Sequence, residues 1–155
     1  MTPARFQQLL ITHAPDMPGI TAAARRDDEN PYGLTATLAG GVPARWTITG
    51  ASPAGAASAS EPPGVGLAPV PAPDLTGRPV PVAAVEQALI ATAVAHAGGQ
   101  IIHIDDYSTR PDPPAVRYGA TIAFRDGWKL FLPCYGTTRP SQPRPGQPYH
   151  PASHI

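Results

Sequence analysis

The chain begins with an amphipathic helical pattern. Four side chains fall on one helical face, at positions i, i+3, i+4 and i+7: Phe6, Leu9, Leu10 and His13. Thr2 can cap this helix, because its hydroxyl can accept a hydrogen bond from a backbone N–H of the first turn. Pro3 suits the first helical position, where no intrahelical donor is needed. The pattern therefore predicts a helix from Pro3 that ends before residues 15–19.

A second helix and two sets of strands follow from the same reasoning. The helix is expected over Val82–Ala97, which is apolar on most sides except for Glu86 and Gln87 and is followed by two glycines. Alternating apolar and polar residues predict strands behind each helix, bounded by turn residues. The expected strands are residues 20–26, 32–38 and 45–49, and then residues 101–107, 116–124 and 128–134.

The last two strands are joined by Asp126-Gly127, which is a strong hairpin signal. A three-residue turn with Gly127 in the left-handed region gives one wholly apolar face, whereas a shift of one residue would scatter that set over both faces. The apolar set is Tyr118, Ala120, Ile122, Phe124, Trp128, Leu130 and Leu132. In this register Cys134 also points inward, where a cysteine behaves as a small hydrophobe.

The two blocks of one helix and three strands resemble each other in sequence. The matches occur in the same order along the chain: residues 6–11 with 85–90, 32–38 with 118–124, and 46–48 with 128–130. We interpret them as an internal duplication, although two unrelated halves that share common strand residues would also show such matches. A repeat constrains the whole fold, so this reading decides the architecture.

The predicted fold class is therefore α+β, built from a duplicated α-β-β-β unit. A unit of about 50 residues buries too little surface to be stable alone, so the two units should pack on each other. We expect an antiparallel sheet of about six strands with both helices on one face; the alternative is two three-stranded sheets with the helices between them. Either arrangement predicts equivalent core positions for Trp46 and Trp128, and for Tyr32 and Tyr118.

Proline is concentrated in two stretches, which divide the chain. Of the 22 prolines, many lie in residues 51–79, a segment of Ala, Pro, Gly and Ser that predicts a flexible linker. Residues 136–155 form a proline-rich tail whose Pro-x-x-Pro patterns can dock in aromatic grooves, but composition alone would also produce them. The expected organisation is a first unit over 1–50, the linker over 51–79, a second unit over 80–135 and the tail over 136–155.

Charge and cysteine content exclude several classes. The 11 basic and 11 acidic residues balance, so neither nucleic acid nor an anionic membrane is a favoured partner. The single cysteine rules out a disulfide framework within the chain. With no signal peptide or membrane span expected, the predicted location is the cytoplasm.

Candidate chemistry is sparse. His103 and Asp105 alternate on one strand face, where they could offer two metal ligands or a base and its orienting carboxylate, but a polar sheet edge in water is the favoured reading. The acidic clusters at residues 27–29 and 105–106 lack the spacing of a calcium loop. His13 and His96 lie near helix ends, where a cation is favoured. We predict no catalytic residue, cofactor or metal.

The arginines are the remaining candidates. Six could form a local patch or simply keep the surface soluble: Arg25, Arg26, Arg45, Arg110, Arg117 and Arg125. We expect a non-enzymatic binding or adaptor protein that acts through protein–protein interaction or self-association, since an open sheet offers a face and two edges. The alternatives are a nucleic-acid accessory protein, and a small-molecule binder or enzyme with a site near His103. The candidate interaction residues are Arg25, Arg26, Arg117, Arg125, His103 and Asp105.

Overall fold

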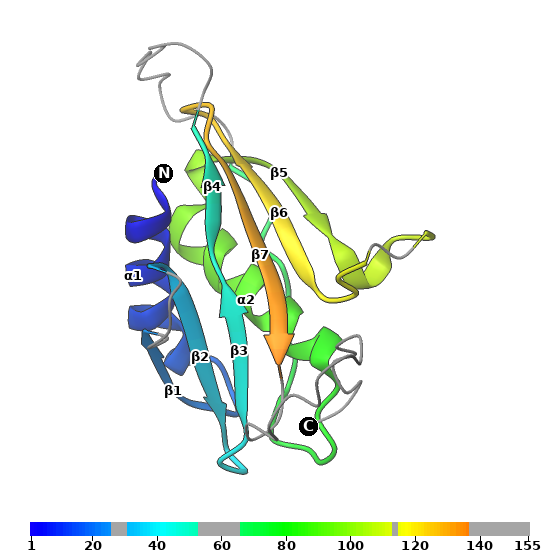
Figure 1. The fold of residues 1–155 in the computed structure, drawn as a ribbon. Coiled ribbons are helices and arrows are strands. Elements are labelled where there is room, and N and C mark those ends of the chain that lie inside the picture. Colours follow the sequence, from blue (N-terminus) through cyan, green and yellow to red (C-terminus); the bar gives the residue numbers. More distant parts are fainter. Residues whose placement is uncertain (26–30, 53–65, 113–114, 137–155) are drawn as a thin grey trace, which may run out of the picture.

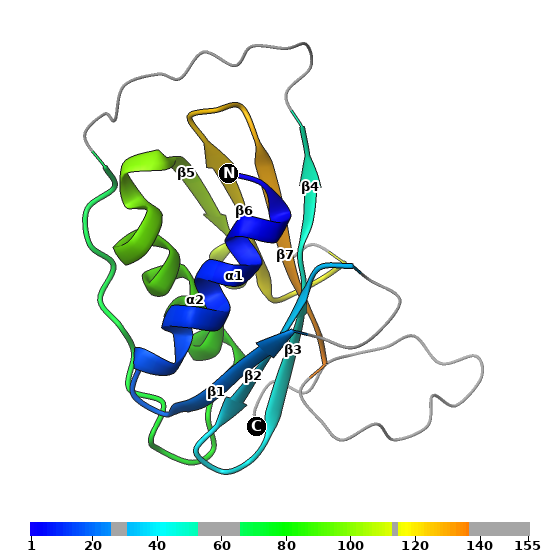
Figure 2. The same ribbon diagram turned by 90° about the vertical axis from the view of Figure 1, so that its left-hand side faces the viewer.

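Two helices cover one face of an antiparallel sheet in the computed structural model, which describes residues 1–25, 31–52, 66–112 and 115–136 (Figures 1 and 2). The α+β class and the antiparallel sheet are thus confirmed, and the alternative of two separate sheets is wrong. The strand order is β1-β2-β3-β7-β6-β5, and β4 pairs with β7. The helices are α1 (Pro3–His13) and α2 (Val82–Ala97), with short 3-10 helices η1 (Ala14–Asp16), η2 (Gly98–Gln100) and η3 (Tyr107–Thr109). The strands are β1 (Ile20–Arg25), β2 (Gly33–Leu38), β3 (Pro43–Thr47), β4 (Thr49–Ala51), β5 (Ile101–Asp106), β6 (Gly119–Phe124) and β7 (Lys129–Gly136).

Both helices begin where the sequence predicts. The Thr2 hydroxyl accepts a hydrogen bond from the Arg5 N–H at 3.4 Å, and Pro3 occupies the first helical position. Helix α2 has the predicted bounds and is buried on most of its length. Its stretch Val82–Gln100 is long and apolar enough to cross a membrane, but 61% of it is buried inside the fold. Burial on several sides explains why this helix is apolar nearly all round.

The β6–β7 hairpin has the predicted register. Ala120 lies opposite Leu132 and Ile122 opposite Leu130, while Gly127 takes a positive φ of 81°. The Phe124 N–H donates to the Trp128 carbonyl at 2.9 Å and closes the three-residue turn. Cys134 faces inward and is 3% exposed, as expected.

The two halves of the chain meet at the centre of the sheet. Strand β3 pairs antiparallel with β7, so that Trp46 lies opposite Cys134. Helix α1 crosses to the second half, where the Phe6 and Phe124 rings form a T-shaped pair with centroids 6.0 Å apart. One hydrophobic core therefore draws on both halves.

The expected equivalence of the two tryptophans is wrong. Trp46 is fully buried in the middle of β3, whereas Trp128 is half-buried and precedes β7. Trp46 lies opposite Leu34, and Leu132 lies opposite Ala120, the residue that the sequence match aligns with Leu34. Leu132 therefore occupies the position equivalent to Trp46. Aligning Trp46 with Trp128 required the β2–β3 turn to be longer than the β6–β7 turn. In the observed register the β2–β3 and β6–β7 hairpins have the same length.

The segment predicted as a linker differs from that expectation in its described parts. Ala51 belongs to β4, which pairs with β7. Residues 66–81, which we call the strap, run along the outside of α2 (Figure 2). Leu75 and Val80 are buried in the core, and the Leu75 N–H donates to the Pro18 carbonyl at 3.2 Å. These few apolar side chains dock the strap despite its Ala- and Pro-rich composition. Gly136, the first residue of the predicted tail, ends β7, whereas residues 26–29 and 137–155 lie outside the described residues.

Candidate interaction site at the end of strand β5

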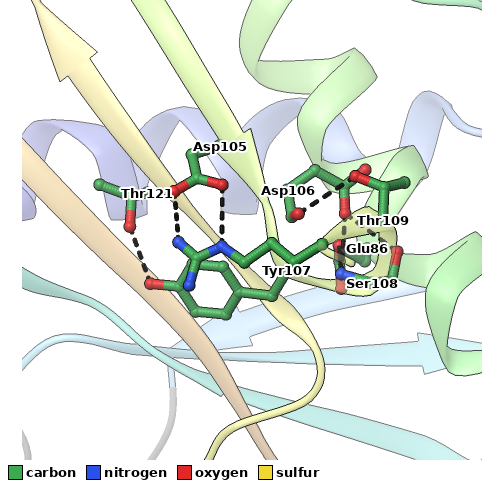
Figure 3. Close-up of polar contacts among 8 residues, drawn as sticks. Glu86, Asp105, Asp106, Tyr107, Ser108, Thr109 and Thr121 are labelled. Atoms are coloured by element: carbon green, nitrogen blue, oxygen red, sulfur yellow. Dashed lines mark hydrogen bonds and ion pairs between the residues drawn. The ribbon is translucent and has the colours of Figure 1, made fainter. Parts of the chain in front are cut away.

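Four side chains are linked on the sheet face opposite the helices. Asp105 and Thr121 are cross-strand partners on β5 and β6, and both side chains point outward (Figure 3). Asp105 holds the Arg110 guanidinium through two hydrogen bonds, with Nε to Oδ1 at 2.9 Å. The guanidinium lies 4.2 Å from the centre of the Tyr107 ring, and the Tyr107 hydroxyl is 2.8 Å from Thr121 Oγ1. Asp105 thereby fixes the Arg110 guanidinium, and Thr121 fixes the Tyr107 hydroxyl.

Exposed aromatic residues continue this face on β7. Phe131 lies opposite Thr121 and is 36% exposed, and Tyr135 is 49% exposed. Both alternate with the buried Leu130, Leu132 and Cys134, so they point away from the helices. We call Tyr107, Arg110, Phe131 and Tyr135 the outer patch.

The turn that carries Tyr107 and Arg110 is anchored from inside the fold. Glu86, on α2, is only 1% exposed. Its carboxyl group accepts hydrogen bonds from the Gly119 N–H at 2.7 Å and from the Ser108 N–H at 3.2 Å. Asp106 accepts from the Ser108 N–H and hydroxyl, at 3.0 and 2.9 Å, and from the Gln87 amide. These bonds tie η3 to α2 and to the start of β6.

The Glu86 carboxyl group also interacts with the Asp106 carboxylate, and the two side chains shift each other's pKa in opposite directions. Burial, together with the hydrogen bond to Asp106, raises the pKa of Glu86 to about 8. Burial alone would also raise the pKa of Asp106, but hydrogen bonds from Glu86, Ser108 and Gln87 outweigh it and lower that pKa. At neutral pH Glu86 is therefore the protonated donor and Asp106 the ionised acceptor. With both oxygens of Glu86 engaged, the pair holds the turn in place.

The first half has a comparable contact. Gln7, on α1, is 2% exposed and donates to the Gly33 carbonyl at 2.7 Å. The sequence matches align Gln7 with Glu86 and Gly33 with Gly119. Each half therefore places a buried polar side chain of its helix against the backbone of the glycine that opens its second strand.

The predicted site residues do not converge. His103 is exposed on β5 opposite Ala123, and the carboxylate of Asp105 is engaged by Arg110. Arg125 donates to the Gly99 carbonyl at 3.1 Å, and the Arg117 guanidinium lies 5.7 Å from the Tyr118 ring centre. Arg25 lies at the opposite edge, on β1. The signal in the sequence for the outer patch was the alternation along β7, which sets Phe131 and Tyr135 on the face opposite Leu130 and Leu132.

Two cavities of the described residues lie elsewhere. One of about 420 Å³ is lined by residues 38–42 and by the strap, and one of about 560 Å³ lies between the start of α1, Tyr32 and Trp128. Neither is lined by His103, Asp105 or Asp106. An enzyme site at these three residues would need them to converge in a pocket, and neither of these two cavities contains them.

Comparisons with known proteins gave no match to any family model, curated protein or solved structure. Function is accordingly inferred from the geometry of this chain.

Proposed function

We propose that the protein is a non-enzymatic binding protein whose outer patch docks another protein. The observation that carries this proposal is the fixed Arg110–Tyr107 stack beside the exposed Phe131, on a sheet face that neither α1 nor α2 covers. Tyrosine and arginine are enriched among residues that dominate binding energy at protein interfaces. A side chain already held in place loses little conformational entropy when a partner binds.

The chemistry of the face defines the partner. Phe131 and Tyr135 present partly exposed aromatic rings that an apolar partner surface would cover. Lys129 is exposed and lies on the same face of β7, two residues before Phe131. The partner we propose is a folded protein with an apolar patch bordered by acidic side chains. The scattered arginines favour this partner over nucleic acid, which would need a basic stripe.

We also propose that the two halves are copies of one α-β-β-β unit. Ile48 donates its N–H to the Tyr32 carbonyl at 2.9 Å, and Cys134 donates to the Tyr118 carbonyl at 2.9 Å. The register of β1 shifts just after Ile20, and that of β5 just after Ile101. Such repeated irregularities support a common origin, because bulges are specific features of a strand pair.

The halves differ on the outward face. In the observed register Phe131 corresponds to Arg45, and Tyr135 to Thr49. The inward positions stay apolar in both halves, as packing requires, while aromatic residues occupy only the second half's equivalent outward positions on the central strands. This difference supports a binding role for the second half's outer surface.

A site-specific photo-cross-linker tests the docking surface. The cross-linking residue is placed at position 131 and, as a control, at Gln8, which is exposed on α1. In extracts of the native cells we expect a protein captured from position 131 and absent from position 8. With that partner purified, Phe131→Ala and Arg110→Ala should each weaken binding at least about tenfold, and Gln8→Ala should not.

Two results would overturn the proposal. Equal capture from both positions, or unchanged binding by both patch variants, would remove the outer patch as the docking surface. A cross-link between two copies of this chain would replace the foreign partner with self-association.

A further inference from the structure

We propose that His13, Asp16 and His96 bind one divalent transition-metal ion. One potential ligand atom from each residue lies within 4.8 Å of the others. His13 Nδ1 is 3.6 Å from Asp16 Oδ2, and the two imidazole rings stack with centroids 3.6 Å apart and planes 9° apart. Three donors of types that bind metals are thus gathered from two separate helical segments.

The fold places these residues together through two helix ends. His13 is the last residue of α1, and Asp16 ends η1 three residues later. His96 lies in the last turn of α2. Ala14 is fully buried between His13 and Asp16 and fixes the backbone that carries both.

Electrostatics at this place favour a cation. The C-terminal end of a helix carries partial negative charge, and two such ends contribute here beside the Asp16 carboxylate. A neutral imidazole is the form that ligates a metal.

The set of donor atoms fits zinc and similar divalent transition metals. Two imidazoles and one carboxylate suit Zn²⁺, Co²⁺ or Ni²⁺, whereas Ca²⁺ and Mg²⁺ prefer oxygen ligands. Tetrahedral zinc places its ligand atoms roughly 3.3 Å apart, given bonds of about 2.0 Å. The rings must therefore turn about their side-chain bonds to aim at one ion. His13 and Asp16 are 34% and 69% exposed, so they have room to do so.

The bound ion would join the end of α1 to the end of α2. It would lie on the helical side of the molecule, away from the outer patch, and the inference is independent of the proposed docking function. An ion that binds only the folded state raises its stability. Three protein ligands leave one coordination position for water.

Titration with Zn²⁺ tests the site. The full chain is used without an affinity tag and with His150→Ala and His154→Ala, because imidazoles of the tail also offer ligands. We expect one Zn²⁺ per chain by calorimetry, and a melting temperature several degrees higher when free Zn²⁺ exceeds Kd about 100-fold. Co²⁺ should give the visible absorption of a four-coordinate site.

Two variants test the imidazole ligands, and a third serves as the control. His96→Ala, an exposed substitution, and His13→Ala should each weaken Zn²⁺ binding at least about tenfold and abolish the rise in melting temperature. His103→Ala is the matched control and should leave both unchanged. The absence of Zn²⁺ binding, or equal affinity in His96→Ala and the parent chain, would overturn the proposal; circular dichroism of each variant without metal excludes loss of folding as the cause.

Discussion

At the residue scale, Glu86 is an acidic side chain that the fold removes almost completely from water. It is 1% exposed, yet it connects α2, η3 and β6 through its two oxygens. A buried acid of this kind is stable when it is protonated and hydrogen-bonded, and it costs free energy when ionised. The contact that holds the outer patch in place is therefore sensitive to pH.

The pKa of Glu86 predicts the sign of this sensitivity. Because the pKa is raised from 4.5 to about 8, the folded state binds more protons than the unfolded state between these values. Stability should therefore fall as pH rises through that window, by at most about 1.4 kcal/mol per pH unit. Glu86→Gln keeps a hydrogen-bond donor for Asp106 and removes the titrating carboxyl group. We therefore expect the free energy of unfolding of this variant to depend less on pH. Urea unfolding at pH 5.5, 7 and 8.5 measures the free energy of unfolding of both proteins.

Gln7→Glu provides the reciprocal variant. It places a buried acid at the comparable position of the first half, beside the Gly33 carbonyl. We expect it to steepen the fall in stability with rising pH. If the free energy of unfolding of Glu86→Gln fell with pH as steeply as that of the parent chain, ionisation of Glu86 would not cause the fall.

At the scale of elements, the strap shows how a proline-rich segment becomes part of the fold. Gly19 has a φ of 91°, and a Cβ there would lie 2.4 Å from the backbone carbonyl carbon of Leu75. The chain before β1 thus approaches the strap as closely as only glycine permits. This contact and the burial of Leu75 fix the strap beside α2.

Gly19→Ala should therefore release the strap. We expect it to lower the free energy of unfolding by about 3 kcal/mol or more, from left-handed strain plus the clash with Leu75. Gly41→Ala is the matched control: its φ is 74°, but no atom lies within 4 Å of the added Cβ, so strain alone should cost about 1 kcal/mol. Urea unfolding measures both, and limited proteolysis should cut residues 66–81 faster in Gly19→Ala alone. Equal losses in the two variants would contradict this role of the strap.

The elements show which features the sequence could predict. Thr2, Pro3 and the Asp126-Gly127 turn act within a few residues, so their effects were predictable. Glu86 was visible as a polar exception on an apolar helix, but its partners lie 22 and 33 residues away. Trp128 was wrongly aligned with Trp46 because the two residues are identical, whereas strand register aligns Trp46 with Leu132. The strap was missed because composition does not indicate where Leu75 and Val80 pack.

At the scale of the whole molecule, both halves build one core. Trp46 of the first half is fully buried, and its cross-strand partner is Cys134 of β7 in the second half. Helix α1 likewise contacts Phe124. Each half alone would expose these surfaces, which are apolar. The centre of the sheet, where β3 meets β7, therefore decides whether the molecule folds.

Two fragments, residues 1–59 and 60–155, test this dependence. We expect each fragment alone to be unfolded, because a unit of this size that lacks half of its core buries too little apolar surface. Mixed in equal amounts, they should fold together, and the fluorescence of Trp46 in the first fragment should shift to shorter wavelength as β7 covers it. Cys134→Asp in the second fragment is the control: a carboxylate opposite Trp46 should prevent association, because an unpaired charge is costly to bury. A fragment that folds alone, with a melting transition independent of its partner, would mean that the half is an autonomous unit and that the β3–β7 pairing joins two cores already formed.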